Sequence, residues 1–204
     1  MTSPLHGEGP RFERGFTRTG STRNSGRAHF LITMTYYDSI SSGYDELYGE
    51  EQLSKLEKVR EVLEEQGLMP QKGDTLLDVG CGSGISTRFW GVEAVGIDPS
   101  SKLIEMAKAK KDGCSYSVGK AESLPFADDS FDVVVSLTAI QNFEDVRKGL
   151  EEIKRVGKGR FILSFLKKAE QASDIKEVIQ RLFTPKKVLE TDKDVIFVIK
   201  ERIS

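Results

Sequence analysis

Apolar residues recur at helical spacing early in the chain and in short unbroken runs further on. Over residues 51–66 they fall on one face of a helix, at Leu53, Leu56, Val59 and Leu63. Gly67 and then Pro70 favour an end to that helix. The run from Phe131 to Ser136 is instead continuously apolar and β-branched, as in a parallel strand buried on both faces.

The rest of the chain alternates between these two patterns. It predicts strands over 75–80, 94–98, 115–118, 131–136 and 160–165, and helices from about residue 85 and over 101–111, 144–156 and 171–183. Residues 187–190 and 195–200 flank Thr191-Asp192-Lys193-Asp194, a turn typical of a hairpin. We therefore predict a doubly wound, Rossmann-like α/β fold, with a mostly parallel seven-stranded sheet and a C-terminal antiparallel hairpin. Ligands of such sheets bind at the carboxyl ends of the strands.

Composition limits the class of protein. A chain of 204 residues with 38% hydrophobic and 30% charged residues suits one domain, or one domain with an appendage. Cys81 and Cys114 alone make neither a disulfide framework nor a zinc site. No apolar run approaches the roughly 20 residues that cross a bilayer, so we expect a cytoplasmic protein with no membrane partner. Both histidines, His6 and His29, precede Met34, which excludes a histidine base or histidine metal cluster after it.

Charge is unevenly distributed along the chain. The net charge of −2 hides an acidic centre, since residues 34–146 hold 10 basic and 21 acidic residues, whereas residues 147–204 hold 15 and nine. Residues 1–33 are rich in Gly, Ser, Thr and Arg without periodicity, which predicts a disordered leader or a start-site extension. A transit peptide is the alternative. The folded domain is predicted over residues 34–204.

A glycine-rich sequence follows the first predicted strand. Asp78-Val79-Gly80-Cys81-Gly82-Ser83-Gly84 leads into a helix, and its glycines let a ligand approach the main chain. Asp98 ends the next strand, 18 residues after Gly80, where a carboxylate can bind both hydroxyls of a ribose. The alternative for Asp98 is a helix cap before Pro99. Ile85 stands at the third glycine site of the dinucleotide fingerprint, which argues against a nicotinamide enzyme, and no Gly-Lys-Ser/Thr follows, which excludes a Walker A loop.

Together these motifs resemble one family. The sequences DVGCGSG, VGIDPS and AESLPFADDSFDVVVS, within residues 36–165, resemble the class I S-adenosylmethionine (SAM)-dependent methyltransferases of the type 11 group. The resemblance implies SAM as cofactor and S-adenosylhomocysteine (SAH) as product. It also implies a cofactor-binding set in this chain: Tyr36, Tyr44, Asp78, Gly80, Cys81, Gly82, Gly84, Asp98, Pro99, Ser100, Ala121, Glu122 and Leu137.

The resemblance also implies what these residues do. The three glycines would wrap the methionine part of SAM, Asp78 would orient its amino group, and Asp98 would hold the ribose. The residues around Pro99 and Ala121 would lie along the adenine, and Leu137 would border the reacting methyl group. The tyrosines at 36, 37 and 44 belong to a segment that closes over SAM. Cys81 has no histidine partner, and we interpret it as a small loop filler rather than a nucleophile.

Two departures from the family pattern affect the chemistry. Lys120 replaces the usual acid of an Asp-Ala-Glu motif, and Ala139-Ile140-Gln141-Asn142-Phe143 replaces a histidine pair after the fourth strand. Transfer of a methyl group from a sulfonium needs alignment, and it needs a base only when the acceptor must lose a proton. Candidate bases are Glu122, Asp145, Tyr36, Tyr37 and Tyr44, each with a plainer structural role, so no catalytic residue and no metal is assigned.

We therefore expect a SAM-dependent methyltransferase with an unidentified acceptor. About 20 residues separate the fifth strand from the hairpin, which leaves an open pocket for a large substrate or for an activating partner subunit. A small-molecule acceptor is favoured, with RNA and protein as alternatives, and the basic C-terminal third gives RNA only weak support. The alternative hypothesis is a SAM-binding module or partner subunit without turnover, which Lys120 and the missing histidines motivate.

Overall fold

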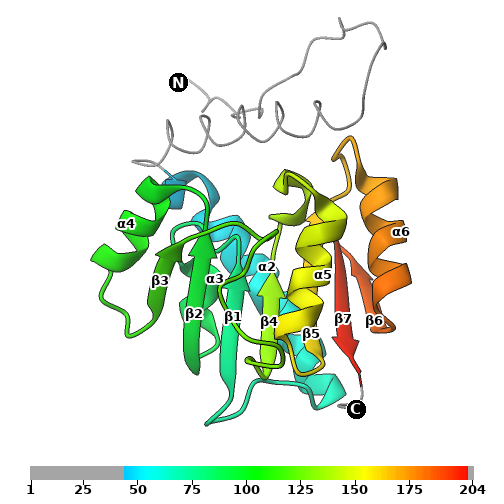
Figure 1. The fold of residues 1–204 in the computed structure, drawn as a ribbon, viewed down its shortest axis with the longest axis horizontal. Helices are drawn as coiled ribbons and strands as arrows, with labels where there is room; N and C mark the ends of the chain where they lie inside the picture. Colours follow the sequence, from blue (N-terminus) through cyan, green and yellow to red (C-terminus); the bar gives the residue numbers. More distant parts are fainter. Residues whose placement is uncertain (1–43, 202–204) are drawn as a thin grey trace, which may run out of the picture.

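A seven-stranded sheet forms the centre of the molecule (Figure 1). The computed structural model describes residues 44–201. The strands are β1 (Thr75–Val79), β2 (Glu93–Asp98), β3 (Ser115–Val118), β4 (Val133–Ser136), β5 (Arg160–Leu166), β6 (Pro185–Glu190) and β7 (Asp194–Lys200). Their order is β3-β2-β1-β4-β5-β7-β6, with β1 to β5 parallel and β7 antiparallel to both of its neighbours. This arrangement confirms the predicted Rossmann-like sheet and its closing hairpin.

Helices cover both faces of the sheet (Figure 1). They are α2 (Tyr44–Gln66), α3 (Ile85–Phe89), α4 (Ser101–Ala109), α5 (Val146–Val156) and α6 (Ala172–Leu182), with a short 3₁₀ helix η2 (Ile140–Asn142). On one face α2 and α3 pack apolar side chains such as Leu56 against Val135. On the other, α5 and α6 pack against Phe161 and its neighbours. None of the helices in the described part of the chain has an apolar stretch long enough to cross a bilayer.

Several elements begin at residues other than those predicted. The fourth strand starts at Val133 rather than at Phe131, which forms only an isolated bridge to Gly157. Between them Asp132 accepts hydrogen bonds from both the amide and the hydroxyl of Thr75, at 2.9 and 2.8 Å, so the segment is joined to β1 by a side chain before the ladder begins. The sequence pattern indicates which residues are buried, and Phe131 is buried although it does not belong to the strand. This is why the predicted strand began two residues too early.

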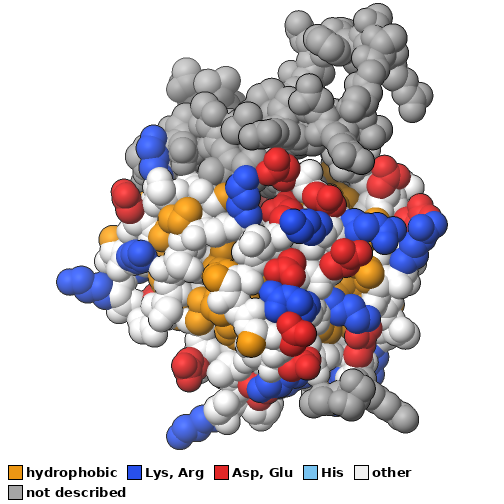
Figure 2. Space-filling view, in the orientation of Figure 1, with side chains coloured by type: hydrophobic (Ala, Val, Ile, Leu, Met, Phe, Trp, Pro, Cys, Tyr) orange, Lys and Arg blue, Asp and Glu red, His pale blue; other side chains and the backbone are white. Residues whose placement is uncertain are grey.

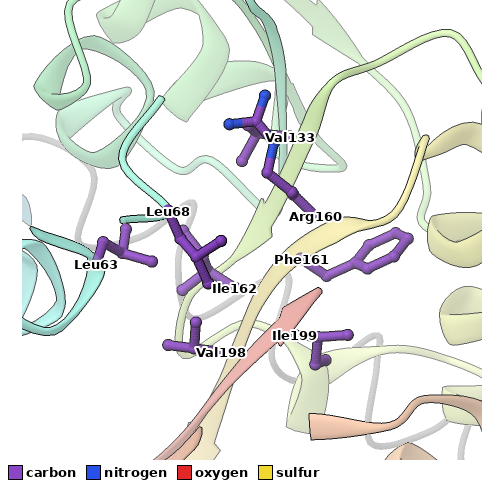
Figure 3. Close-up of a pocket in the computed structure, with 8 residues that line it drawn as sticks. All are labelled: Leu63, Leu68, Val133, Arg160, Phe161, Ile162, Val198 and Ile199. Carbon is purple, nitrogen blue, oxygen red and sulfur yellow. The ribbon is translucent and has the colours of Figure 1, made fainter. Parts of the chain in front are cut away.

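A small apolar cavity of about 10 Å³ lies between α2 and the sheet (Figure 3). It is at the amino ends of the parallel strands and is lined by Leu63, Leu68, Val133, Arg160, Phe161, Ile162, Val198 and Ile199. The guanidinium of Arg160 is engaged with Asp74 at 2.7 Å. A gap of this size with apolar walls is a packing defect rather than a ligand site.

Candidate functional site

The loop after β1 is shaped by three glycines with positive φ. Their φ values are 78° at Gly80, 54° at Gly82 and 85° at Gly84, a backbone region that favours glycine. Space is a second constraint, because a Cβ on Gly80 would lie 2.3 Å from Cβ of Ala139, and one on Gly84 would lie 2.5 Å from the hydroxyl of Tyr116. Backbone conformation and close neighbours therefore both favour glycine at positions 80 and 84 of this loop.

Hydrogen bonds from the loop to β2 fix its position. The carbonyl of Ile97 accepts from the amides of Gly80 and Cys81 at 2.7 and 3.1 Å. The Asp98 carboxylate accepts from the amide of Gly82 through Oδ2 and from the amide of Ser100 through Oδ1, each at 2.9 Å. The N-cap of α4 is Ser100, whose hydroxyl accepts from the Leu103 amide at 3.3 Å. Ser100, rather than Asp98, is therefore the N-cap of α4. Asp98 instead links the glycine loop to the residue that begins α4.

Asp78 is a fully buried carboxylate under the loop. Its Oδ2 accepts from the hydroxyls of Ser86 and Thr87 at 2.5 and 2.8 Å. Its Oδ1 is buried and meets no hydrogen-bond donor in the part of the chain that the structure describes. Burial raises the pKa of Asp78 to about 6, and the nearby Asp98 charge adds to the rise. A cationic amino group would supply the missing donor and restore the charged form.

Cys81 fills space in the loop. Its side chain is buried against Ile104, Ala107 and Tyr116, and burial raises the pKa of its thiol. A thiol that is both inaccessible and held neutral is a poor nucleophile. This position agrees with the interpretation of Cys81 as a filler.

The other predicted cofactor residues lie near the same edge. Ala121 and Leu137 are buried and pack against opposite faces of the sheet, and Pro99 is half-buried beside Ser100. Glu122 accepts a hydrogen bond from the Asp145 amide at 3.0 Å, so its carboxylate is engaged at the start of α5.

Two further residues singled out from the sequence, Asp145 and Lys120, have defined contacts, whereas the tyrosine predictions are not tested. Asp145 is the N-cap of α5 and accepts from the Lys148 amide at 3.0 Å, which supports a structural role. Lys120, the departure from the family pattern, pairs with Glu144 at 2.9 Å. Tyr36 and Tyr37 lie outside the described residues, as does the predicted boundary at Met34, and of Tyr44 only its place at the start of α2 is described.

The structure adds residues that the sequence did not single out. After β4, Thr138 has a φ of 59° and lies beside a buried ion pair between Lys55 of α2 and Asp194 of β7. Gln141 of η2 has a buried carboxamide oxygen without a donor among the described residues. One signal was present in the sequence, since Lys55 lies four residues before Val59 on the buried side of its helix. Within residues 44–201 no group of three or more His, Cys, Asp or Glu side chains could hold a metal ion.

The chain is similar in sequence to known methyltransferases. Residues 77–163 match the family described as "Methyltransferase domain". Demethylmenaquinone methyltransferase of Thermotoga maritima is 34% identical over 143 residues, which cover 64% of this chain and 59% of that protein. The chain spans about half the length of the curated relatives it matches.

Solved structures share the fold. The Synechocystis magnesium protoporphyrin IX methyltransferase with bound SAM superposes with a TM-score of 0.70 at 17% identity, over 85% of this chain and 97% of that one. The methyltransferase chain of a Haloferax volcanii complex with the Trm112 activator gives a TM-score of 0.67 at 20% identity, over 81% of this chain and 97% of that one. At these identities the likeness shows a common fold and nothing finer.

Proposed function

We propose that this chain, whose residues 77–163 match a methyltransferase domain, is a class I enzyme that transfers a methyl group from SAM to an acceptor and releases SAH. When bound, SAM supplies a methyl group on a sulfonium, and neutral SAH is the leaving group. The carbon–sulfur bond breaks as the acceptor lone pair bonds to the methyl carbon. Any proton on the acceptor is lost to solvent or to a base that we do not assign.

The single observation that carries the proposal is the pair of carboxylates at the ends of β1 and β2. Asp78 has a buried oxygen that lacks a donor, which fits the ammonium of the methionine part of SAM. Asp98 lies at the rim of the loop and is 8% exposed, which fits a role toward the ribose. The three positive-φ glycines form the turn that Asp98 bonds through the Gly82 amide. This set fits a nucleoside with a cationic tail.

The chain's own residues act mainly by positioning. The amide of Gly82 donates to Asp98, which positions the loop relative to the end of β2. Leu137, buried at the end of β4, offers an apolar wall that excludes water from the reacting centre. Positioning and exclusion of water suit a reaction whose leaving group is good and therefore needs little chemical assistance.

A small molecule is the acceptor class that we favour. Figure 2 shows Lys and Arg side chains interspersed with Asp and Glu over the face that α5 and α6 cover. Arg155, for example, pairs with Glu152 at 2.7 Å and with Asp128 at 2.8 Å. Basic groups neutralised in this way do not make the continuous positive patch that RNA binding uses.

Calorimetric titration with SAM and SAH tests the cofactor half of the proposal. We expect wild-type protein to bind both ligands and Asp78→Asn to bind them more weakly, because an amide lacks the charge that attracts an ammonium. Absence of SAM and SAH binding by the wild-type protein would overturn the proposal. A screen of amines, amides, alcohols and thiols, read out as SAH release, then tests turnover.

A SAM-binding subunit that needs a partner for turnover is the second candidate. Lys120 in place of the usual acid motivates it, and the Haloferax volcanii fold neighbour was solved with an activator. SAM binding without SAH release from any acceptor in the screen would favour this second candidate. SAH release that Gly82→Val abolishes would exclude it.

A further inference from the structure

A buried ion pair joins α2 to the start of β7 at the reacting edge of the sheet. Nζ of Lys55 lies 2.9 Å from both carboxylate oxygens of Asp194, and the two side chains are 3% and 2% exposed. Both groups also bond Thr138: Lys55 donates to its hydroxyl, and that hydroxyl donates to Oδ1 of Asp194 at 3.1 Å. Burying two charges is costly, and an apolar pair of similar size would serve packing equally well.

Thr138 is held in an unfavourable backbone conformation. A φ of 59° is a genuine outlier for a β-branched residue. Its amide donates to the hydroxyl of Ser164 at 2.9 Å, and its carbonyl accepts from Nε2 of Gln141 at 2.7 Å. Every polar atom of Thr138 is thus bonded, so the surroundings dictate the turn that directly follows Leu137. Strain that is fixed in this way gathers at functional sites.

Gln141 lies in η2, three residues after Thr138, and bonds this turn. Its Nε2 donates to the carbonyl of Thr138, while its Oε1 is buried and has no donor within the described residues. Three side-chain atoms share that condition, and two of them, Oδ1 of Asp78 and Oε1 of Gln141, lie at or just beyond the carboxyl ends of β1 and β4. Oδ1 of Asp78 fits the ammonium of the cofactor, which leaves Oε1 of Gln141 as a hydrogen-bond acceptor for the other substrate. A buried acceptor without a donor is unstable until a ligand supplies one.

We propose that Lys55 and Asp194 are positioning residues, which act through Thr138 to hold Gln141 so that its carboxamide oxygen accepts a hydrogen bond from the methyl acceptor. The acceptor is then an amine, an amide or a hydroxyl compound. This identification of the ligand rests on the proposed function. The geometric part, in which the ion pair controls the turn, does not depend on it.

A purely structural role would be a tether between α2 and the hairpin. The chain contains a natural control for that role, because Lys193 pairs with Glu51 at 2.6 Å and so joins α2 to the β6–β7 turn without touching Thr138. This second pair is exposed, with side chains 63% and 39% accessible. Loss of a tether and loss of support for Thr138 can therefore be separated.

Hydrogen exchange measured by NMR tests the geometric part on the full chain. The test variant is the double replacement Lys55→Met with Asp194→Leu, which leaves no buried charge and is expected to fold. We expect the amides of Thr138, Asn142 and Phe143 to exchange at least tenfold faster in this variant and at wild-type rates in Lys193→Met. Unchanged rates in the double variant, or equal changes in both variants, would overturn the proposal.

Variants of Gln141 test the chemical part. Gln141→Leu removes both the acceptor oxygen and the nitrogen that bonds Thr138, whereas Gln141→Glu loses that nitrogen but keeps an acceptor oxygen. We therefore expect kcat/KM toward an acceptor from the screen to fall at least tenfold in the first and by less in the second. SAH binding should match wild type in both. Wild-type kcat/KM in Gln141→Leu, or acceptors that have neither N–H nor O–H, would refute this part alone. Absence of SAH binding in every variant and in wild type would instead refute the proposed function.

Discussion

The carboxylate of Asp98 accepts a hydrogen bond from the backbone amide of Gly82 at 2.9 Å, which joins the end of β2 to the loop after β1. One side chain therefore shapes the loop, and the proposed function assigns the same side chain to the ribose. Loop geometry and ligand binding are consequently linked at this residue.

Replacement of Asp98 by Ala should weaken SAH binding strongly. Loss of a hydrogen bond to a charged group costs about 1.5–3 kcal/mol, so we expect a Kd at least about tenfold higher. Asp132→Asn is the control, because Asp132 bonds Thr75 at the amino edge of the sheet and should affect stability without affecting affinity. Isothermal titration calorimetry measures the SAH affinity of both variants. Wild-type affinity in Asp98→Ala would contradict the ribose assignment.

Gly80→Ala should destabilise the fold more than Gly67→Ala does. Both glycines have positive φ, at 78° and 62°, so both variants carry a similar backbone penalty of roughly 1–2 kcal/mol. Only at position 80 does the new Cβ also meet a neighbour, Ala139, at 2.3 Å, whereas nothing lies within 4 Å at position 67. Thermal unfolding compares the two variants. Equal shifts in Tm would mean that the loop relaxes to admit the methyl group.

Asp78 should make stability and binding depend on pH. Because its pKa is raised from 3.8 to about 6 in the folded state, the folded protein binds the proton more tightly than the unfolded chain. The stabilising contribution is therefore complete below about pH 4 and is lost as the pH rises through 6, a change of about 3 kcal/mol. Urea unfolding at pH 4 to 7 should show this decline in wild type relative to Asp78→Asn.

The same carboxylate should give SAH binding the opposite dependence. An ammonium favours ionised Asp78, so affinity should increase from pH 5 to pH 7 and binding near pH 6 should release protons to the buffer. Titrations in buffers of different ionisation enthalpy measure that release. A flat profile, or one shared by Asp78→Asn, would remove Asp78 from the cofactor site.

Lys55→Met should destabilise the protein far more than the double replacement with Asp194→Leu. The single change leaves Asp194 as a buried charge without its partner, which typically costs about 3–5 kcal/mol. The double change removes both charges and should return stability to within about 1 kcal/mol of wild type. Free energies of unfolding from urea titration test this, and equal losses in the two variants would contradict it.

The sequence by itself determined the sheet, the hairpin and the glycine loop with its two acids. Strand runs such as residues 75–79 are local and report burial directly, and the spacing from Gly80 to Asp98 follows from one strand–helix–strand unit. Such features need no knowledge of distant residues. The cofactor site therefore rests on residues that the sequence already singled out.

Only the tertiary structure revealed the contacts from which the acceptor site is proposed. Lys55 and Asp194 are 139 residues apart, and the turn sequence that contains Asp194 signalled a hairpin but nothing about an ion pair. The positive φ of Thr138 and the buried oxygen of Gln141 likewise depend on what α2, β5 and β7 bring to the end of β4. Periodicity records which face of an element is buried, whereas the partner of a buried polar group is set by how distant elements pack together.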